Sequence, residues 1–251
     1  MNMNIEESGG GRHIAPLSKT SQVERFFPVC IDNFFNNPDK IVRYAKKLPK
    51  GSIKNPAGHS VFQTEPLWTI SQELNYLIIL KILSSYYDLS YQNLSWDNAE
   101  VTFKEHPAPS ENKNDVRNRG WIHHDNYDYG RKEKSLNEDI ALMELAGLIY
   151  LTPDIDPDSG TSLYMLKPSD TEYEPGFCGA LYKDLWSDED LYRKNYEKHE
   201  NLFIEKTRFS NIYNRMLVYD TNEFHRANSY YSEEGKDIRL TLVFFIGGLK
   251  V

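Results

Sequence analysis

The sequence has too few cysteines for a disulfide framework or a cysteine-based metal site. Cys30 and Cys178 are its two cysteines, and they lie far apart without a CxxC pair. This pattern excludes zinc fingers and small disulfide-stapled folds, and it indicates a reducing compartment. We therefore expect a cytoplasmic protein.

Long apolar segments and excess positive charge are missing as well. No stretch approaches the roughly 18 apolar residues of a membrane span, and the N-terminus lacks the charged-then-apolar order of a signal peptide. The 29 Lys and Arg are outnumbered by 37 Asp and Glu, which gives a net charge of -8. Because nucleic-acid backbones are bound through clustered positive charge, nucleic acid is disfavoured. We expect a small molecule, an amino acid or a peptide as partner, and no membrane.

Length and composition fit one globular domain. The chain has 251 residues, of which 39% are hydrophobic, enough for a core that supports a preformed pocket. Residues 1–20 are polar and rich in glycine, so we expect a flexible N-terminal tail there. Residues 21–251 are expected to form the single domain. The oligomeric state cannot be read from the sequence.

Helical signals occur at three places. Asn37 is a suitable N-cap and Pro38 a suitable first residue, so a helix is expected to begin there. A second helix is predicted over 71–87, where leucine and isoleucine recur at helical spacing. A third is predicted over 187–199, with Ser187 as its N-cap and acidic residues in its first turn. The segment 50–66 is predicted to be a loop.

The rest of the chain consists of short β-type runs separated by turns. The predicted strands are 99–106, 120–127, 146–153, 160–166, 214–220 and 239–248. Few helices alternate with these strands, which favours an α+β, mainly β fold. We expect a double-stranded β-helix (jelly roll) with its core at about 99–249 and the N-terminal helices packed on one face. The polar loops 107–120 and 126–140 are either lids or plain insertions.

A His-x-Asp pair gives the first chemical signal. His123 and Asp125 lie two apart, and in a β-strand such residues project from the same face. A second histidine, His225, follows the apolar run 214–220 and is expected near a strand end. Two imidazoles and one carboxylate on one face of iron(II) leave positions open for a bidentate co-substrate and oxygen. His124 with Asp125 is the alternative pair, and a β-bulge would favour it.

A lone His-x-Asp pair is usually structural, but an arginine strengthens the case. Arg239 opens an otherwise apolar strand, and Thr241 lies two residues later on the same face. A buried arginine needs an anionic partner, because an unpaired buried charge is costly. A guanidinium matches a carboxylate in its geometry, and a neighbouring hydroxyl adds a further hydrogen bond.

Together these residues resemble the iron(II)- and 2-oxoglutarate-dependent oxygenase superfamily. The runs 147–151 and 160–164 are similar to its prolyl-hydroxylase-like branch and its small bacterial and phage-type members. The resemblance covers about residues 99–249. One departure is Arg239, where many prolyl hydroxylases have lysine.

The resemblance implies a role for each matched residue. His123, Asp125 and His225 match the metal ligands, which would bind Fe(II). Arg239 matches the catalytic-site residue that pairs with the distal carboxylate of 2-oxoglutarate, and Thr241 the accompanying hydroxyl. Tyr150 corresponds to a strand position that lines the co-substrate pocket.

The activity implied is a hydroxylase that consumes O2 and 2-oxoglutarate and releases succinate and CO2. Halogenating relatives replace the acidic ligand with a small residue, so Asp125 favours hydroxylation. Two alternatives remain open: a non-catalytic sensor that binds the metal and 2-oxoglutarate, and a cupin-like metal enzyme without 2-oxoglutarate.

The sequence context alone suggests positions for four further residues. His199 is expected at the surface or flanking a helix, and Trp121 in the core or at the pocket wall. Arg226 and Asn228 are expected to face either the substrate or solvent.

Overall fold

The computed structural model describes residues 26–54, 60–90, 94–125, 143–168, 188–231 and 238–250. The tail expected at 1–20 and the loop expected at 126–140 lie outside the described residues.

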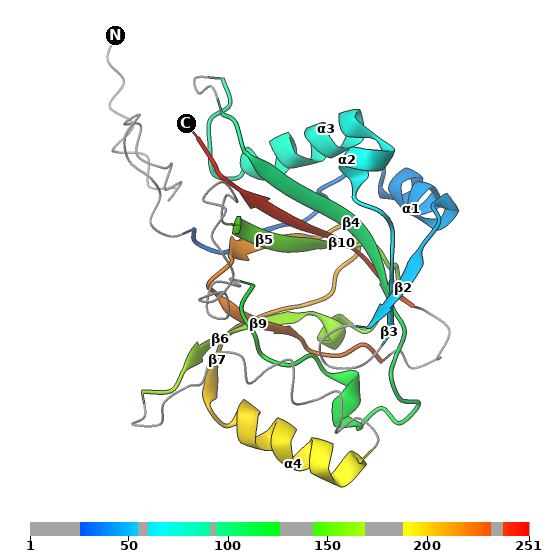
Figure 1. The fold of residues 1–251 in the computed structure, drawn as a ribbon, viewed down its shortest axis with the longest axis vertical. Helices are drawn as coiled ribbons and strands as arrows, with labels where there is room; N and C mark the ends of the chain where they lie inside the picture. The colour runs from blue at the N-terminus through cyan, green and yellow to red at the C-terminus, as the bar shows by residue number, and fades with distance from the viewer. Residues whose placement is uncertain are drawn as a thin grey trace, which may run out of the picture.

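Two antiparallel sheets face each other and form the body of the protein (Figure 1). The large sheet has the order β1-β8-β5-β10-β4-β3-β2, and its strands are β1 (Val29–Ile31), β2 (Gly51–Lys54), β3 (Ser60–Gln63), β4 (Asn98–His106), β5 (Met143–Tyr150), β8 (Met216–Asp220) and β10 (Arg239–Gly247). The small sheet has the order β7-β6-β9, with β6 (Thr161–Leu166), β7 (Phe203–Phe209) and β9 (Phe224–Ala227). The predicted α+β, mainly β jelly roll is confirmed.

Helices cover the outer faces of both sheets (Figure 1). The N-terminal helices α1 (Pro38–Lys47), α2 (Leu67–Ile70) and α3 (Gln72–Leu83) lie over the large sheet, and α4 (Glu189–Glu200) lies beside the small one. Two short 3-10 helices span Val116–Asn118 and Pro157–Ser159. Among the described residues, no helix is long and apolar enough to cross a membrane.

Side-chain alternation along β10 separates the core from the interior of the jelly roll. Leu240, Leu242 and Phe244 point outward, into one buried cluster with Ile79 and Ile82 of α3. Arg239 and Thr241 take the intervening positions, on the face toward the small sheet. The expected separation of polar and apolar residues along this strand is therefore confirmed.

The helix starts follow local capping chemistry. Asn37 Oδ1 accepts a hydrogen bond from the Lys40 amide (3.0 Å), and Pro38 is the first residue of α1, as predicted. Ser71 caps α3, but this helix ends at Leu83 instead of residue 87. The Ser84 hydroxyl bonds to the Lys81 carbonyl (2.7 Å), and such local bonds compete with helix continuation.

Other predictions about the elements were wrong. The N-cap of α4 is Asp188, which accepts from the Leu191 amide (3.0 Å); Ser187 lies outside the described residues. The segment 50–66, predicted as a loop, forms the hairpin β2–β3 beside β4. β7 was missed because most of its side chains are exposed and several are charged, which hides the strand alternation.

A close backbone approach in the large sheet leads to a stability prediction. A Cβ at Gly147 would lie 2.3 Å from the Leu217 carbonyl oxygen and 2.5 Å from the Phe244 ring. Gly147→Ala should lower the free energy of unfolding by about 1–3 kcal/mol in urea denaturation, because strand or ring must shift. Gly51→Ala is the matched control: nothing lies within 4 Å of its Cβ, so a change below about 0.5 kcal/mol is expected. Equal effects of the two substitutions would contradict the packing argument.

Candidate metal centre

Backbone hydrogen bonds bring the two histidine-bearing segments side by side. The His123 amide donates to the His225 carbonyl (3.0 Å), and the His225 amide donates to the His123 carbonyl (2.7 Å). His225 was expected at the end of the strand that is now β8. It lies instead within β9 of the other sheet, after a turn that crosses between the sheets. The Asp125 amide donates to the Thr221 carbonyl of that turn (2.9 Å).

The strand predicted over 120–127 is not formed in its described part, 120–125, where the only strand-like pairing is an isolated bridge between His123 and His225. The Gly120 amide bonds to the Ala227 carbonyl (2.8 Å), while His123 pairs with His225. From Gly120 to His123 the chain moves three residues, whereas the paired stretch of β9, from Ala227 to His225, moves two. The segment therefore contains one extra residue, as in a β-bulge. His123 and Asp125 nevertheless converge on His225.

The three side chains form a compact cluster. One ligand atom from each of His123, Asp125 and His225 lies within 4.8 Å of the others. The Asp125 oxygens lie 3.7 Å from His123 Nε2 and 3.4 Å from His225 Nε2. Asp125 and His225 are buried, whereas His123 is half-exposed. A buried carboxylate between two imidazoles, with one ligand open to solvent, suits a divalent transition metal.

The hydrogen bonds of the imidazoles set their tautomers for metal binding. His123 Nδ1 lies 2.8 Å from the Trp121 carbonyl, and His225 Nδ1 lies 2.9 Å from the Glu223 carbonyl. Because a carbonyl only accepts, each Nδ1 carries the proton. Each Nε2 then directs its lone pair toward Asp125, which is the orientation that a metal requires. Burial lowers the pKa of His225 to about 4, so this imidazole is neutral near pH 7.

His124 does not join the cluster. Its ring packs against that of Phe224, with centroids 5.2 Å apart. Phe224 contacts the apolar cluster of Ile122, Tyr164 and Phe203. The alternative pair of His124 and Asp125 therefore lacks support from the geometry.

A second polar site lies on the inner face of the large sheet. Arg239 is 3% exposed, and its guanidinium lies 5.5 Å from the ring centroid of Tyr150 and 5.6 Å from that of Tyr230. Within the part of the chain that the structure describes, its Nε and Nη2 atoms have no hydrogen-bond partner, and neither has the Thr241 hydroxyl. Thr241 pairs across the sheet with Tyr150, whose hydroxyl donates to Thr161 (2.8 Å).

These unsatisfied donors indicate an anionic ligand. A buried guanidinium with two unpaired nitrogens is costly, and a carboxylate would pair with those two nitrogens. Tyr219 connects the two sites: its ring centroid lies 4.6 Å from that of His225, and both Asp125 and Arg239 act electrostatically on its hydroxyl, whose pKa burial raises. Tyr219 was missed because a tyrosine within an apolar strand gives no distinctive signal.

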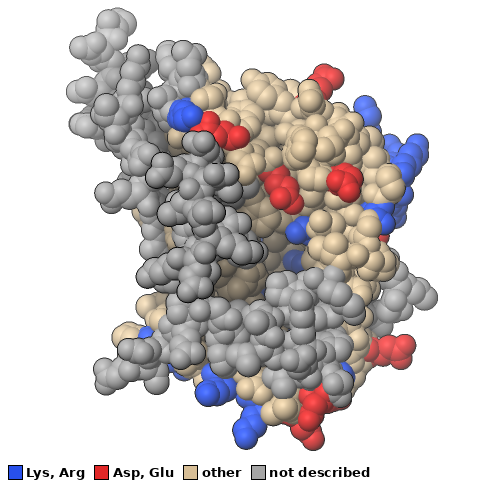
Figure 2. Space-filling model, viewed as in Figure 1, with Lys and Arg blue, Asp and Glu red and all other residues tan. Residues whose placement is uncertain are grey.

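Lys104 is a further unpredicted residue of this inner face. It pairs with Thr241 from β4, and within the described part of the chain no hydrogen bond or ion pair holds its ammonium. Burial lowers the pKa of Lys104, while the carboxylates of Glu100 and Asp125 oppose that shift. Figure 2 shows this side of the molecule hollowed between the two sheets, with blue Lys or Arg atoms at the wall of the hollow.

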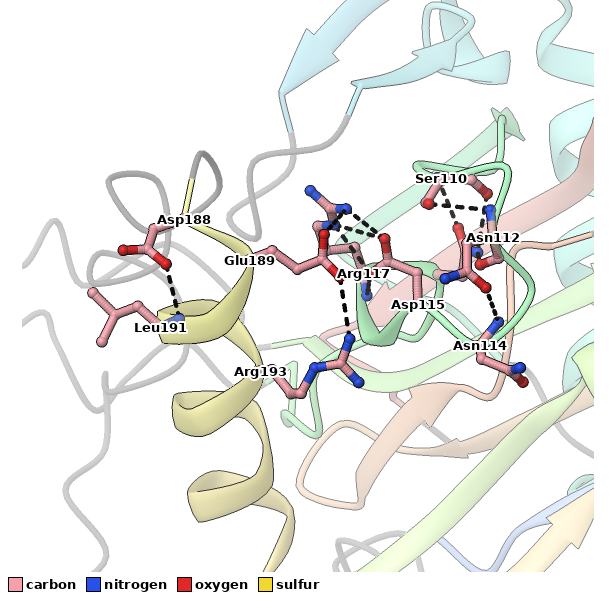
Figure 3. Close-up of polar contacts among 10 residues, drawn as sticks. Ser110, Asn112, Asn114, Asp115, Arg117, Asp188, Glu189, Leu191 and Arg193 are labelled. Atoms are coloured by element: carbon pink, nitrogen blue, oxygen red, sulfur yellow. Dashed lines mark hydrogen bonds and ion pairs between the residues drawn. The ribbon is translucent and has the colours of Figure 1, made fainter.

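The loop before the metal centre is tied down. The Asn118 side chain bonds to the backbone of Ser110 and Asn112, and Arg117 forms a bidentate pair with Asp115. Arg117 also reaches Glu189 in the first turn of α4 (3.2 Å), as Figure 3 shows. These bonds favour an ordered insertion over a lid for 107–120.

Several context-based assignments were wrong or incomplete. His199 is 1% exposed, and its Nε2 donates to the Ile122 carbonyl (2.8 Å). Arg226 does not face solvent but is buried against α4, where it contacts Tyr196 and Glu200. Asn228 is buried as well, and Trp121 lies in the core. Burial against a helix that is distant in sequence leaves no local pattern, so the sequence could not reveal these contacts.

Comparison with solved structures identifies the fold. An oxidoreductase of the 2OG-Fe(II) oxygenase family from Burkholderia pseudomallei matches with a TM-score of 0.50 and 12% identity, over 89% of this chain and 86% of that chain. SnoN, a non-heme alpha-ketoglutarate-dependent epimerase from nogalamycin biosynthesis, matches with a TM-score of 0.50 and 12% identity, over 88% and 78%. The chain therefore has the fold of the 2OG-Fe(II) oxygenases. Identities this low establish the fold alone.

The branch within this fold is not decided by similarity. A prolyl hydroxylase from Trichoplax adhaerens, in complex with a hypoxia inducible factor peptide fragment, matches with a TM-score of 0.46 and 11% identity, over 88% of this chain and 83% of that chain. That score is too low to single out the prolyl-hydroxylase branch. No protein-family pattern and no curated protein matches the sequence.

The cluster leads to a metal-binding prediction. The protein should bind one Ni(II) ion in isothermal titration calorimetry, and Asp125→Ala or His225→Ala should weaken binding by about 100-fold or more. His124→Ala is the neighbouring control, and its affinity should stay within about threefold of the unsubstituted protein because its ring faces Phe224. Loss of binding in His124→Ala with retention in His225→Ala would rule out the assigned ligands.

Proposed function

We propose that this protein is an Fe(II)- and 2-oxoglutarate-dependent dioxygenase that hydroxylates a C–H bond of a small molecule, an amino acid or a peptide. The observation that carries the proposal is the combination of two features in one jelly roll. A His-Asp-His cluster with both Nε2 atoms directed inward lies across from a buried arginine with unsatisfied nitrogens.

Each residue then has a defined task. His123, Asp125 and His225 would hold Fe(II), and with 2-oxoglutarate and O2 bound the iron supplies the oxidising chemistry that releases succinate and CO2. Arg239 would bind the distal carboxylate of 2-oxoglutarate through Nε and Nη2, and Thr241 would donate its hydroxyl to the same group. Tyr150 would support the guanidinium with its ring, 5.5 Å away.

The alternatives explain less of the site. A cupin-like enzyme without 2-oxoglutarate needs the metal ligands but leaves the buried Arg239 without a carboxylate. A sensor would use both sites and differs only in the absence of turnover. Asp125 fills the ligand position that halogenating enzymes of this fold leave to chloride, so hydroxylation is favoured. The reducing compartment expected from the cysteines would keep the iron ferrous.

A lysine on the inner face of the large sheet also indicates the charge of the substrate. Lys104 is half-buried on this face, no ion pair holds its ammonium among the residues that the structure describes, and Asp125 acts on it electrostatically. An anionic group on the substrate would offset the cost of burying this charge. We therefore favour a substrate with a carboxylate or a similar anion near the oxidised carbon.

Succinate formation tests the activity. Anaerobically iron-loaded protein given 2-oxoglutarate and air should form succinate, and Asp125→Ala and His225→Ala should abolish it. Arg239→Ala should raise the apparent KM for 2-oxoglutarate by about 100-fold, because a charged hydrogen-bonded pair in a buried site is lost. Arg239→Lys should raise the KM for 2-oxoglutarate less, since the positive charge remains but the bidentate geometry of the guanidinium is lost.

A matched control and two contrary outcomes complete this test. Arg208→Ala removes an exposed arginine of β7 whose ion pair in the described structure is with Glu205, and it should leave the KM unchanged. Tight 2-oxoglutarate binding without succinate under any condition would identify a sensor. Turnover that needs the metal ligands but is indifferent to Arg239 would identify a different metal enzyme.

The charge of the substrate is tested with paired compounds. In a library in which each carboxylate is matched by its amide, the carboxylates should stimulate succinate formation more strongly, and Lys104→Met should remove that preference. Lys46→Met, an exposed lysine of α1, is the control. An unchanged preference in Lys104→Met would refute this substrate class, and a raised KM for 2-oxoglutarate would assign Lys104 to the co-substrate instead.

A further inference from the structure

One face of α4 contacts both of the segments that carry the histidine ligands. The helix lies beside the outer face of the small sheet, on the side away from the large sheet (Figure 1). Its buried residues Tyr192, Tyr196 and His199 recur at helical spacing. Glu189 and Glu200, at the two ends of the helix, are more exposed.

The first set of contacts holds the segment that precedes His123. Glu189 binds Arg117 (3.2 Å), and the Tyr192 hydroxyl accepts from Trp121 Nε1 (2.7 Å). The Tyr196 hydroxyl donates to the Gly120 carbonyl (3.3 Å) and His199 Nε2 to the Ile122 carbonyl (2.8 Å). Four residues of one helix therefore bind residues of the short segment 117–122.

The second set holds β9 beside His225. Arg226 donates to the Tyr196 hydroxyl, and its Nη2 lies 2.7 Å from Glu200. Its guanidinium also lies over the rings of Tyr164 and Tyr196. Tyr196 thus accepts from the residue next to His225 and donates to the segment that leads to His123.

These contacts matter because the ligand segment is poorly fixed by strand pairing. The extra residue between Gly120 and His123 takes the carbonyls of this stretch out of regular register with β9. The carbonyls of Gly120, Trp121 and Ile122 instead accept from Tyr196, His123 and His199, respectively. Buried carbonyls need such partners, and the one on Trp121 sets the tautomer of His123.

We propose that α4 positions both histidine ligands of the metal centre, with His199 and Tyr196 as the positioning residues that act through the backbone at 120–122 and through Arg226. The proposal rests on the metal-binding role proposed for His123, Asp125 and His225. Neither positioning residue belongs to the ligand cluster, so their effect on the metal is exerted through the groups that they hold.

Co(II) binding to the full chain, followed by its visible absorption bands, tests this role. His199→Ala should weaken Co(II) binding by about 10- to 100-fold, as is typical for residues that orient metal ligands, and should change the absorption bands. His199→Gln should restore most of the affinity, because its amide can donate to the Ile122 carbonyl. Lys198→Ala, on the exposed side of the same helix turn, should change neither.

A second variant distinguishes a weakened metal site from a loss of folding. Tyr196→Phe removes one hydroxyl that joins Arg226 to Gly120, and it should weaken Co(II) binding by about 3- to 10-fold while circular dichroism of the metal-free protein stays unchanged. If both variants bind Co(II) like the unsubstituted protein, the inference is wrong even if they are less stable, and the metal centre stands. If the unsubstituted protein binds no Co(II), the metal centre and this inference fail together.

Discussion

The reciprocal hydrogen bonds between the backbones of His123 and His225 are the constraint on which the site depends. They attach the segment 120–125 to the free edge of β9 and so place two imidazoles 4.4 Å apart, centroid to centroid. Asp125 follows on the same segment and lies between them. Without this pairing, the ligands would belong to separate parts of the chain and could not bind one ion.

The large sheet lies opposite the His-Asp-His cluster, and its strand β10 has a different task on each face. On β10, the outward leucines and Phe244 pack under the helices, which fixes the strand firmly enough to hold a buried arginine on its other face. Two nitrogens of this guanidinium have no hydrogen-bond partner among the described residues, which is costly unless a ligand such as the proposed carboxylate binds there. The alternation of side chains along β10 thus places core packing on one face of the strand and the proposed carboxylate site on the other.

Particular elements show where sequence reasoning succeeds. The cap at Asn37, the alternation along β10 and the His-x-Asp spacing are local rules, and the structure agrees with each of them. The wrong predictions concern elements and side chains whose structure depends on contacts with residues distant in the sequence. β7 and the β2–β3 hairpin are short or exposed strands that exist because a neighbouring strand offers its edge. His199 is buried because a helix packs on a segment far from it in sequence.

The sequence by itself determined which side chains are available and which face of each strand they occupy, because side-chain direction follows from backbone periodicity. It therefore indicated His123, Asp125, His225 and Arg239 together. The tertiary structure alone decided the irregular pairing at 120–123, the tautomers of the two imidazoles and the attachment of α4 to both ligand segments. These features depend on hydrogen bonds between groups distant along the chain, and no local pattern encodes such bonds.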